Sequence, residues 1–215
     1  MWNGLFFGLM SLFSPQASLP DLVTVESHIQ QFAQLYRIDA GRIQLRKSVL
    51  NNPSPFLTHS GIKTCTVHIN HHSDAKRVWS HFLNTGHDSA ENALLAFTSA
   101  HELTHCLLSE PGRRPAARKA LENHLGYSFR NNTHFEETLA DLVGLAYVQK
   151  TLPADFGWVL DRLKTIRTDF SSRDPDHDSS SALQAQSLEL VDRLFSLDHP
   201  LRLAETSTAE KFAGN

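Results

Sequence analysis

Apolar residues recur every three to four positions in several stretches of the chain, which is the period of a helix that buries one face. In Leu22–Tyr36, the residues Val25, Ile29 and Phe32 have this spacing. Asp21 stands directly before Leu22 as a capping residue. A shorter helix is expected at residues 116–124, between a Pro-Gly pair and Gly126. The longer helices are predicted at Leu22–Tyr36 and at residues 93–109, 133–150, 152–170 and 183–197.

Two other stretches alternate apolar and polar residues, which is the period of a half-buried strand. They are residues 43–50 and residues 62–70. One face of the second stretch carries Lys63, Cys65, Val67 and Ile69. Residues 51–60 lie between them, contain two prolines and are predicted to form a loop. These elements together predict an α+β fold with a small N-terminal sheet and a mainly helical C-terminal half.

A local histidine cluster follows the second predicted strand. It consists of His68 within the strand and His71 and His72 after it. No carboxylate or cysteine at ligand spacing completes a metal site there, so the cluster is interpreted as part of a solvated loop.

The helix predicted at residues 93–109 contains the motif HELTH at residues 101–105. Its two histidines lie one helical turn apart on one face, so both imidazoles can reach one tetrahedral zinc ion at about 2.0–2.1 Å. Glu102 lies beside the first histidine, where its carboxylate can take a proton from a zinc-activated water. Uncharged residues surround the motif, as a buried metal-binding helix requires. Asp88 and Glu91 form a D-x-x-E capping box near the start of this helix.

The helix predicted at residues 133–150 supplies a matching carboxylate. Thr133 and Glu136 form a T-x-x-E capping box, which directs Glu136 back to the helix start and leaves Glu137 free. Asp141 follows Glu137 by four residues and so lies about 40° round the helix, where it can orient a ligating imidazole. The predicted ligands of a single Zn²⁺ ion are His101, His105 and Glu137.

Length and charge limit the classes of function. The 215 residues fit one domain with a sizeable core. The chain has 20 Lys and Arg against 23 Asp and Glu, a formal net charge of −3. No basic stripe interleaved with aromatic residues is present in the sequence, so no nucleic-acid partner is predicted. The one basic cluster, at residues 113–119, is interpreted as a solvated helix start.

The chain has two cysteines, Cys65 and Cys106. Two thiols can form a disulfide only when their geometry allows it, so the sequence leaves their pairing open. Cys106 follows His105 directly and therefore points about 100° away from it on a helix. We expect Cys106 to be a small buried residue and not a metal ligand.

The N-terminus carries a nine-residue apolar run at residues 5–13. This length suits a signal peptide and is too short to span a bilayer, although no Lys or Arg precedes the run. We expect residues 1–18 to be a signal peptide and residues 19–215 to form the single domain of an exported protein, periplasmic or secreted. The alternative is a cytoplasmic protein whose N-terminal segment docks on the domain. No later stretch is a transmembrane candidate, so stable membrane insertion of the mature chain is not expected.

The motif HELTH followed by a helix containing ETLAD, at residues 137–141, resembles the gluzincin metallopeptidases, thermolysin and its relatives. The pattern E-x-x-A-D followed by a later His-Pro is more similar to the prenyl-protein proteases and their periplasmic relatives. The resemblance covers residues 98–106 and 136–144 and, more weakly, residues 195–202. It implies a zincin-like fold in which His101, His105 and Glu137 bind one zinc ion and Glu102 is the general base.

The same families use a later His or Tyr to stabilise the oxyanion. His199, followed by Pro200, resembles the His-Pro element, although Arg202 stands closer to it than the arginine of the family usually does. His177, in an Asp-Pro-Asp-His tetrapeptide similar to one in thermolysin, is the alternative. His199 is the preferred candidate.

The expected function is that of a zinc-dependent endopeptidase acting on a peptide or protein substrate. The strand at residues 62–70 is a candidate edge for pairing with an extended substrate. One alternative is a non-catalytic or chaperone-like zinc-binding module on the same scaffold, and another is a helical structural protein without metal. The natural substrate, the side-chain specificity and the oligomeric state cannot be read from the sequence.

Overall fold

The protein is a mixed α+β structure, as the sequence predicts, and its small sheet has three strands where the sequence predicted two. The computed structural model describes residues 19–61, 64–83, 87–110, 112–171, 174–183, 189–191 and 194. The predicted signal peptide and His199 lie outside the described residues. The helices and strands, in chain order, are α1 (Leu22–Tyr36), β1 (Ile43–Ser48), β2 (Phe56–Ser60), β3 (Cys65–Asn70), α2 (Ser73–Leu83), α3 (Ala90–Leu108), α4 (Arg113–Leu125), α5 (Asn132–Thr151) and α6 (Phe156–Ser171). Short 3₁₀ turns are η1 (Ala40–Arg42), η2 (Pro175–His177) and η3 (Ser180–Ala182).

The sheet has the strand order β1-β3-β2. β1 runs parallel to β3, whereas β2 runs antiparallel to it. The alternation predicted for β3 is confirmed, because Cys65, Val67 and Ile69 are buried on one face. The edge role expected for residues 62–70 is wrong, because β3 is the central strand and β2 lies at the edge.

The loop predicted at residues 51–60 is wrong in its second half, because Phe56–Ser60 is strand β2. The reason is a long-range interaction of Asn70, whose side chain is completely buried. It accepts a hydrogen bond from Leu50 N at 2.9 Å and donates to Asn52 O at 2.7 Å. These bonds hold the proline-containing turn and return the chain alongside β3.

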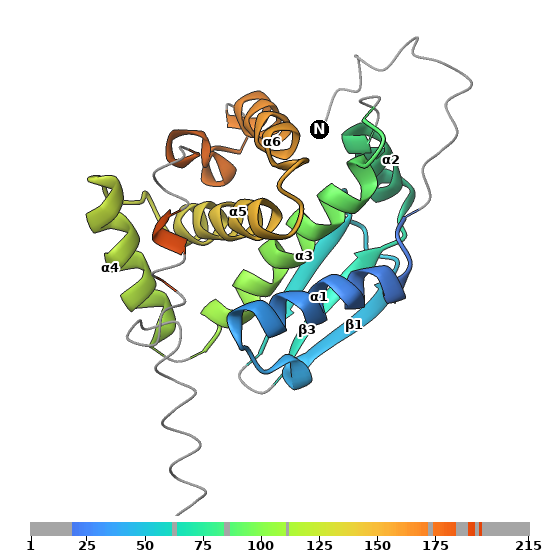
Figure 1. The fold of residues 1–215 in the computed structure, drawn as a ribbon, viewed down its shortest axis with the longest axis horizontal. Coiled ribbons are helices and arrows are strands. Elements are labelled where there is room, and N and C mark those ends of the chain that lie inside the picture. The colour runs from blue at the N-terminus through green and yellow to red at the C-terminus, as the bar shows by residue number, and fades with distance from the viewer. Residues whose placement is uncertain are drawn as a thin grey trace, which may run out of the picture.

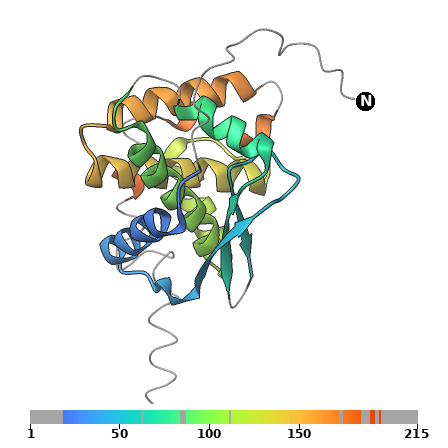
Figure 2. The same cartoon turned by 90° about the vertical axis from the view of Figure 1, so that its right-hand side faces the viewer.

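The helices are arranged in layers on one side of the sheet. α1 and α3 pack against one sheet face, and α5 and α6 lie on the far side of α3 (Figure 1). On the opposite sheet face, which we call the outer face, Gln44, Arg46 and His59 are exposed, and none of the described helices covers it (Figure 2). α3 is therefore the central helix of the protein, and most of its residues are buried on every side.

Both predicted capping boxes are wrong, although the helices themselves form. α3 begins after Ser89, whose hydroxyl donates to Asp155 and accepts no hydrogen bond from a backbone N–H of the helix. α5 begins after Asn131, whose side chain accepts a hydrogen bond from His134 N at 2.8 Å. Glu136 therefore does not return to the cap. It forms an ion pair with Arg114 of α4 at 2.8 Å.

The remaining helices differ from prediction mainly at their starts. α1 has the predicted bounds, with Asp21 accepting a hydrogen bond from Thr24 N at 2.9 Å. α4 begins three residues earlier than expected, and its Arg113 is buried and paired with Glu110 at 2.7 Å, so the basic cluster is only partly solvated. α6 begins at Phe156 because Leu152 ends α5 and a turn follows. Of the helix predicted at residues 183–197, residues 183, 189–191 and 194 are described. Leu183 follows η3 and is not helical, whereas residues 189–191 and 194 are helical.

The two cysteines form a disulfide between β3 and α3. Cys65 and Cys106 have a Cα–Cα distance of 5.6 Å, and both are buried. Cys106 is buried, as the sequence predicted, and it also forms the disulfide that the sequence left open. The bridge ties the end of the motif-bearing helix to the central strand. Among the described helices, none has the length and apolar character needed to cross a membrane.

Candidate metal centre

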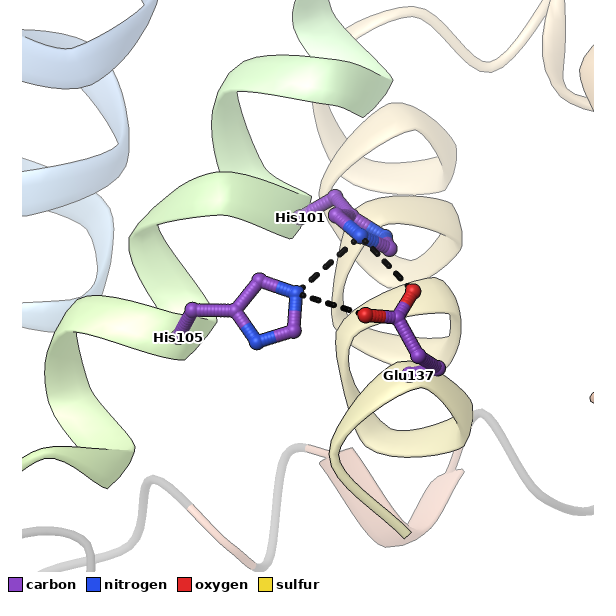
Figure 3. A group of neighbouring side chains, drawn as sticks. All are labelled: His101, His105 and Glu137. Carbon is purple, nitrogen blue, oxygen red and sulfur yellow. Dashed lines mark hydrogen bonds and ion pairs between the residues drawn. The ribbon is translucent and has the colours of Figure 1, made fainter. Parts of the chain in front are cut away.

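Three side chains from two helices converge on one point. His101 and His105 come from α3 and Glu137 comes from α5 (Figure 3). The two histidine Nε2 atoms lie 3.2 Å apart. Glu137 Oε2 lies 3.5 Å from His101 Nε2, and Glu137 Oε1 lies 3.4 Å from His105 Nε2. The structure thus brings together the three residues that the sequence predicted as ligands.

This spacing fits a tetrahedral ion. Ligand atoms at zinc bond lengths of 2.0–2.1 Å and tetrahedral angles lie about 3.3 Å from one another. The separation of the two Nε2 atoms is within a few tenths of an ångström of that value, and so is the distance from each Nε2 to one oxygen of Glu137, Oε2 for His101 and Oε1 for His105. Two imidazole nitrogens and one carboxylate are also the donor set of a catalytic zinc site, which leaves the fourth position open. The residues present therefore fit a zinc ion.

Close packing of α3 against α5 creates this convergence. Gly144 of α5 lies against Phe97 of α3, and a Cβ built on Gly144 would be 2.7 Å from the Phe97 ring. Only a residue without a side chain allows the two helices to approach so closely. The ligands lie one to two helical turns from this contact, so its closeness helps to set the distance between the imidazoles and the carboxylate.

Behind His101 stands the carboxylate that the sequence assigned to orient a ligand. Asp141 Oδ1 lies 3.0 Å from His101 Nδ1, and the Asp141 side chain is completely buried. Arg167 of α6 donates to both carboxylate oxygens at 2.7 Å, and Ser179 Oγ donates to Oδ2 at 2.5 Å. With Nδ1 directed at Asp141, His101 presents Nε2 to Glu137. Sequence reasoning missed Arg167 and Ser179, because no local pattern connects them with the motif.

The charges of the cluster favour a carboxylate beside a protonated imidazole. Burial acts to lower the pKa of His101, but Asp141 and Glu137 outweigh it and raise this pKa to about 10. Burial and the charge of His101 lower the pKa of His105 to about 4. Burial acts to raise the pKa of Glu137, but the hydrogen bond and charge of His101 lower it to about 2. Near neutral pH and without a bound cation, His101 is therefore the protonated member of the cluster. A cation that binds to its Nε2 must displace the proton there.

The predicted general base lies beside the cluster and is held by the edge strand. Glu102 is 8% exposed, and its Oε2 accepts a hydrogen bond from Thr58 Oγ1 of β2 at 2.5 Å. Burial raises the pKa of the Glu102 carboxyl above its usual value. Thr58 was missed because its segment was predicted to be a loop. No local alternation of apolar and polar residues in Phe56–Ser60 marks this strand, so the sequence offers no signal for Thr58.

The alternative oxyanion residue also reaches the cluster. His177, in η2, places Nε2 3.5 Å from Glu137 Oε1. Its Nδ1 lies 2.8 Å from Asp174 Oδ2. The His177 side chain is 37% exposed and is therefore accessible from solvent. The preferred candidate, His199, lies outside the described residues.

Comparisons with protein families, with curated proteins and with solved structures find no match for this chain. The assignment of a function therefore depends on the geometry and chemistry of the residues themselves.

Proposed function

We propose that this chain is a zinc-dependent endopeptidase of the gluzincin type with a zincin-like fold. The observation that supports it is the convergence of His101, His105 and Glu137 at zinc-ligand spacing, next to the buried carboxylate of Glu102. A structural zinc site is closed by four protein ligands, whereas three ligands beside a spare carboxylate are typical of a hydrolytic site.

Zinc bound by these three ligands would lower the pKa of a water molecule toward about 7 and polarise the scissile carbonyl. Glu102 would accept the proton of the attacking water and pass it to the leaving amine. Thr58 supports this role because its hydroxyl holds one oxygen of the Glu102 carboxylate. Asp141, with Arg167 and Ser179 behind it, would hold His101 in the tautomer that presents Nε2.

His177 is the described residue best placed to stabilise the oxyanion. Its Nε2 lies 3.5 Å from Glu137 Oε1, and its Nδ1 lies beside Asp174. A donor aimed at the developing oxyanion contributes about 2–4 kcal/mol to lowering the barrier. The sequence favours His199 for the same role. Comparing the peptide hydrolysis of His177→Ala with that of His199→Ala distinguishes the two candidates.

We expect an extended peptide substrate to bind along the edge of the sheet next to this cluster. β2 lies at the edge of the sheet, and its Thr58 contacts Glu102. A substrate strand added along β2 would have its backbone recognised by hydrogen bonds while its side chains remain variable. The strand expected to pair with the substrate is therefore Phe56–Ser60. The sequence had suggested residues 62–70 for this role.

The disulfide supports export of the protein. Disulfides form and persist in the periplasm and outside the cell but are rare in the cytosol. The Cys65–Cys106 bridge is buried and joins two core elements, so it is suited to a structural role. We therefore propose that the protein acts in the periplasm or outside the cell.

The decisive experiment is Glu102→Gln in the full chain, measured for zinc content and for hydrolysis of a peptide library. We expect one equivalent of zinc to remain while hydrolysis is lost. The matched control is Glu91→Gln, the same change at an exposed position in the first turn of α3. Undiminished hydrolysis by Glu102→Gln would remove this residue from the mechanism. One bound zinc without turnover in the wild-type protein would instead favour the non-catalytic zinc module.

A further inference from the structure

We propose that His59 and His68 form a second metal site, on the outer face of the sheet, for late first-row divalent cations such as Cu²⁺. The sequence groups His68 with His71 and His72, but in the structure its partner is His59 of the neighbouring strand. His72 instead directs Nδ1 to the backbone N–H of Asp74 at 3.3 Å. This proposal is independent of the proposed peptidase function.

The two histidines have the mutual geometry of a chelating pair. His59 Nδ1 and His68 Nε2 lie 3.1 Å apart, and the ring centroids are 5.0 Å apart at an interplanar angle of 83°. At the candidate zinc centre, the Nε2 atoms of His101 and His105 lie 3.2 Å apart, with centroids 5.0 Å apart and an angle of 71°. Both pairs therefore direct two imidazole nitrogens at a single point. On the outer face this point lies between two adjacent strands, whose backbone hydrogen bonds fix its position.

A hydroxyl orients one of the two rings. Ser48 Oγ of β1 lies 2.6 Å from His68 Nδ1. When Nδ1–H donates to this oxygen, the other nitrogen, Nε2, keeps its lone pair and faces His59. This is the arrangement of a ligating histidine whose second nitrogen is held by an outer partner. Asp141 performs the same function for His101 at the other site.

The surroundings determine which ions this site would prefer. His59 is exposed, so an ion can reach the pair directly from solvent and complete its coordination with water. Imidazole ligands favour Cu²⁺, Ni²⁺ and Zn²⁺ over Mg²⁺ or Ca²⁺, and Cu²⁺ binds most tightly of these. Arg46 pairs with His68 across the sheet, and its positive charge opposes a cation. We therefore expect Arg46→Gln to strengthen binding.

The test is a Cu²⁺ titration of the full chain already loaded with one equivalent of zinc, followed by electron paramagnetic resonance. We expect one further equivalent with hyperfine coupling to two nitrogens, and zinc content should stay unchanged. Either His59→Ala or His68→Ala should abolish this signal. His81→Ala, an exposed histidine on α2, is the matched control and should retain it. Ser48→Ala should weaken binding about tenfold, as expected for loss of an outer partner.

Three results would overturn the proposal. They are the absence of a second equivalent in the wild-type protein, the same affinity in His59→Ala and His68→Ala as in the wild type, and loss on replacing only one of the two histidines. Circular dichroism shows whether each variant is folded, and His59→Gln and His68→Gln repeat the test with smaller changes in the size of the side chain.

Discussion

Replacing Thr58 by valine tests how the general base is positioned. Valine has nearly the shape of threonine and suits a strand, but it lacks the hydroxyl that donates to Glu102 Oε2 at 2.5 Å. A hydrogen bond to a charged group is worth about 1.5–3 kcal/mol. At 1.36 kcal/mol per factor of ten, its loss from the transition state should lower kcat/KM by about 10- to 150-fold. The Glu102 carboxylate would remain in place but would be less firmly held.

The assay is steady-state peptide hydrolysis with kcat and KM separated, together with zinc content and urea unfolding. We expect the loss to appear in kcat, with KM and one equivalent of zinc unchanged, because Thr58 contacts the base and not the proposed ligands. Thr58→Ser keeps the hydroxyl and should recover most of the activity. Thr66→Val on β3 is the matched control, since Thr66 faces the outer side of the sheet opposite His59.

Wild-type kcat/KM in Thr58→Val would refute the reasoning, because it would show that Glu102 needs no support from β2. Equal damage in Thr58→Ser and Thr58→Val would also refute it. That result would assign the effect to packing of the methyl group and not to the hydroxyl.

Further predictions concern the metal, the disulfide and the helix contact. Because the His101 pKa is about 10 in the metal-free protein, zinc must displace one proton, and zinc affinity should rise about tenfold per pH unit between about pH 6 and pH 9, as measured by competition with a chelator. The Cys65–Cys106 bridge closes a loop with a sequence separation of 41, so reducing it should lower the free energy of unfolding by about 4 kcal/mol, as measured by urea denaturation. Gly144→Ala places a methyl group 2.7 Å from the Phe97 ring and should lower the free energy of unfolding by about 1–2 kcal/mol and weaken zinc binding.

Each of these predictions has a control. Zinc affinity that stops rising above pH 6.5, the ordinary histidine value, would show that His101 is not held protonated by its carboxylates. Reductant should not change the urea midpoint of a Cys65→Ala, Cys106→Ala double variant. If reductant also leaves the midpoint of the wild-type protein unchanged, the bridge does not stabilise the fold. Gly157→Ala adds the same methyl group to α6 in open space and should not destabilise the protein. If Gly144→Ala is equally harmless, close approach is not what holds the two helices together.

Helical periodicity accounts for the parts of the site that the sequence could predict. Residues four apart on one helix face the same way whatever surrounds the helix, so the pairing of His101 with His105 follows from spacing alone. The same argument places Glu137 and Asp141 on one face of α5. It succeeds even though the predicted capping box is wrong, since the relative direction of two residues does not depend on where a helix begins.

Elements whose bonds reach across the chain were not predictable. β2 exists because the buried Asn70 holds the turn before it, and no local alternation marks that strand. Thr58 was missed for this reason, and Arg167 was missed because it lies on a third helix, 26 residues after the carboxylate it binds. The capping box of α5 failed because Asn131, also a good capping residue, stands closer to the true helix start. The box of α3 failed because the helix begins after Ser89, whose side chain makes no capping bond.

By itself the sequence determined which residue types share a helix face and which positions of β3 are buried, since these follow from the backbone period. Tertiary structure alone decided that α3 and α5 pack closely enough for a carboxylate to meet two imidazoles. It also decided that Cys65 meets Cys106, and that a strand hydroxyl reaches the general base. Each of these depends on distances between separate elements, which are set by side-chain packing across the whole core and not by any local pattern.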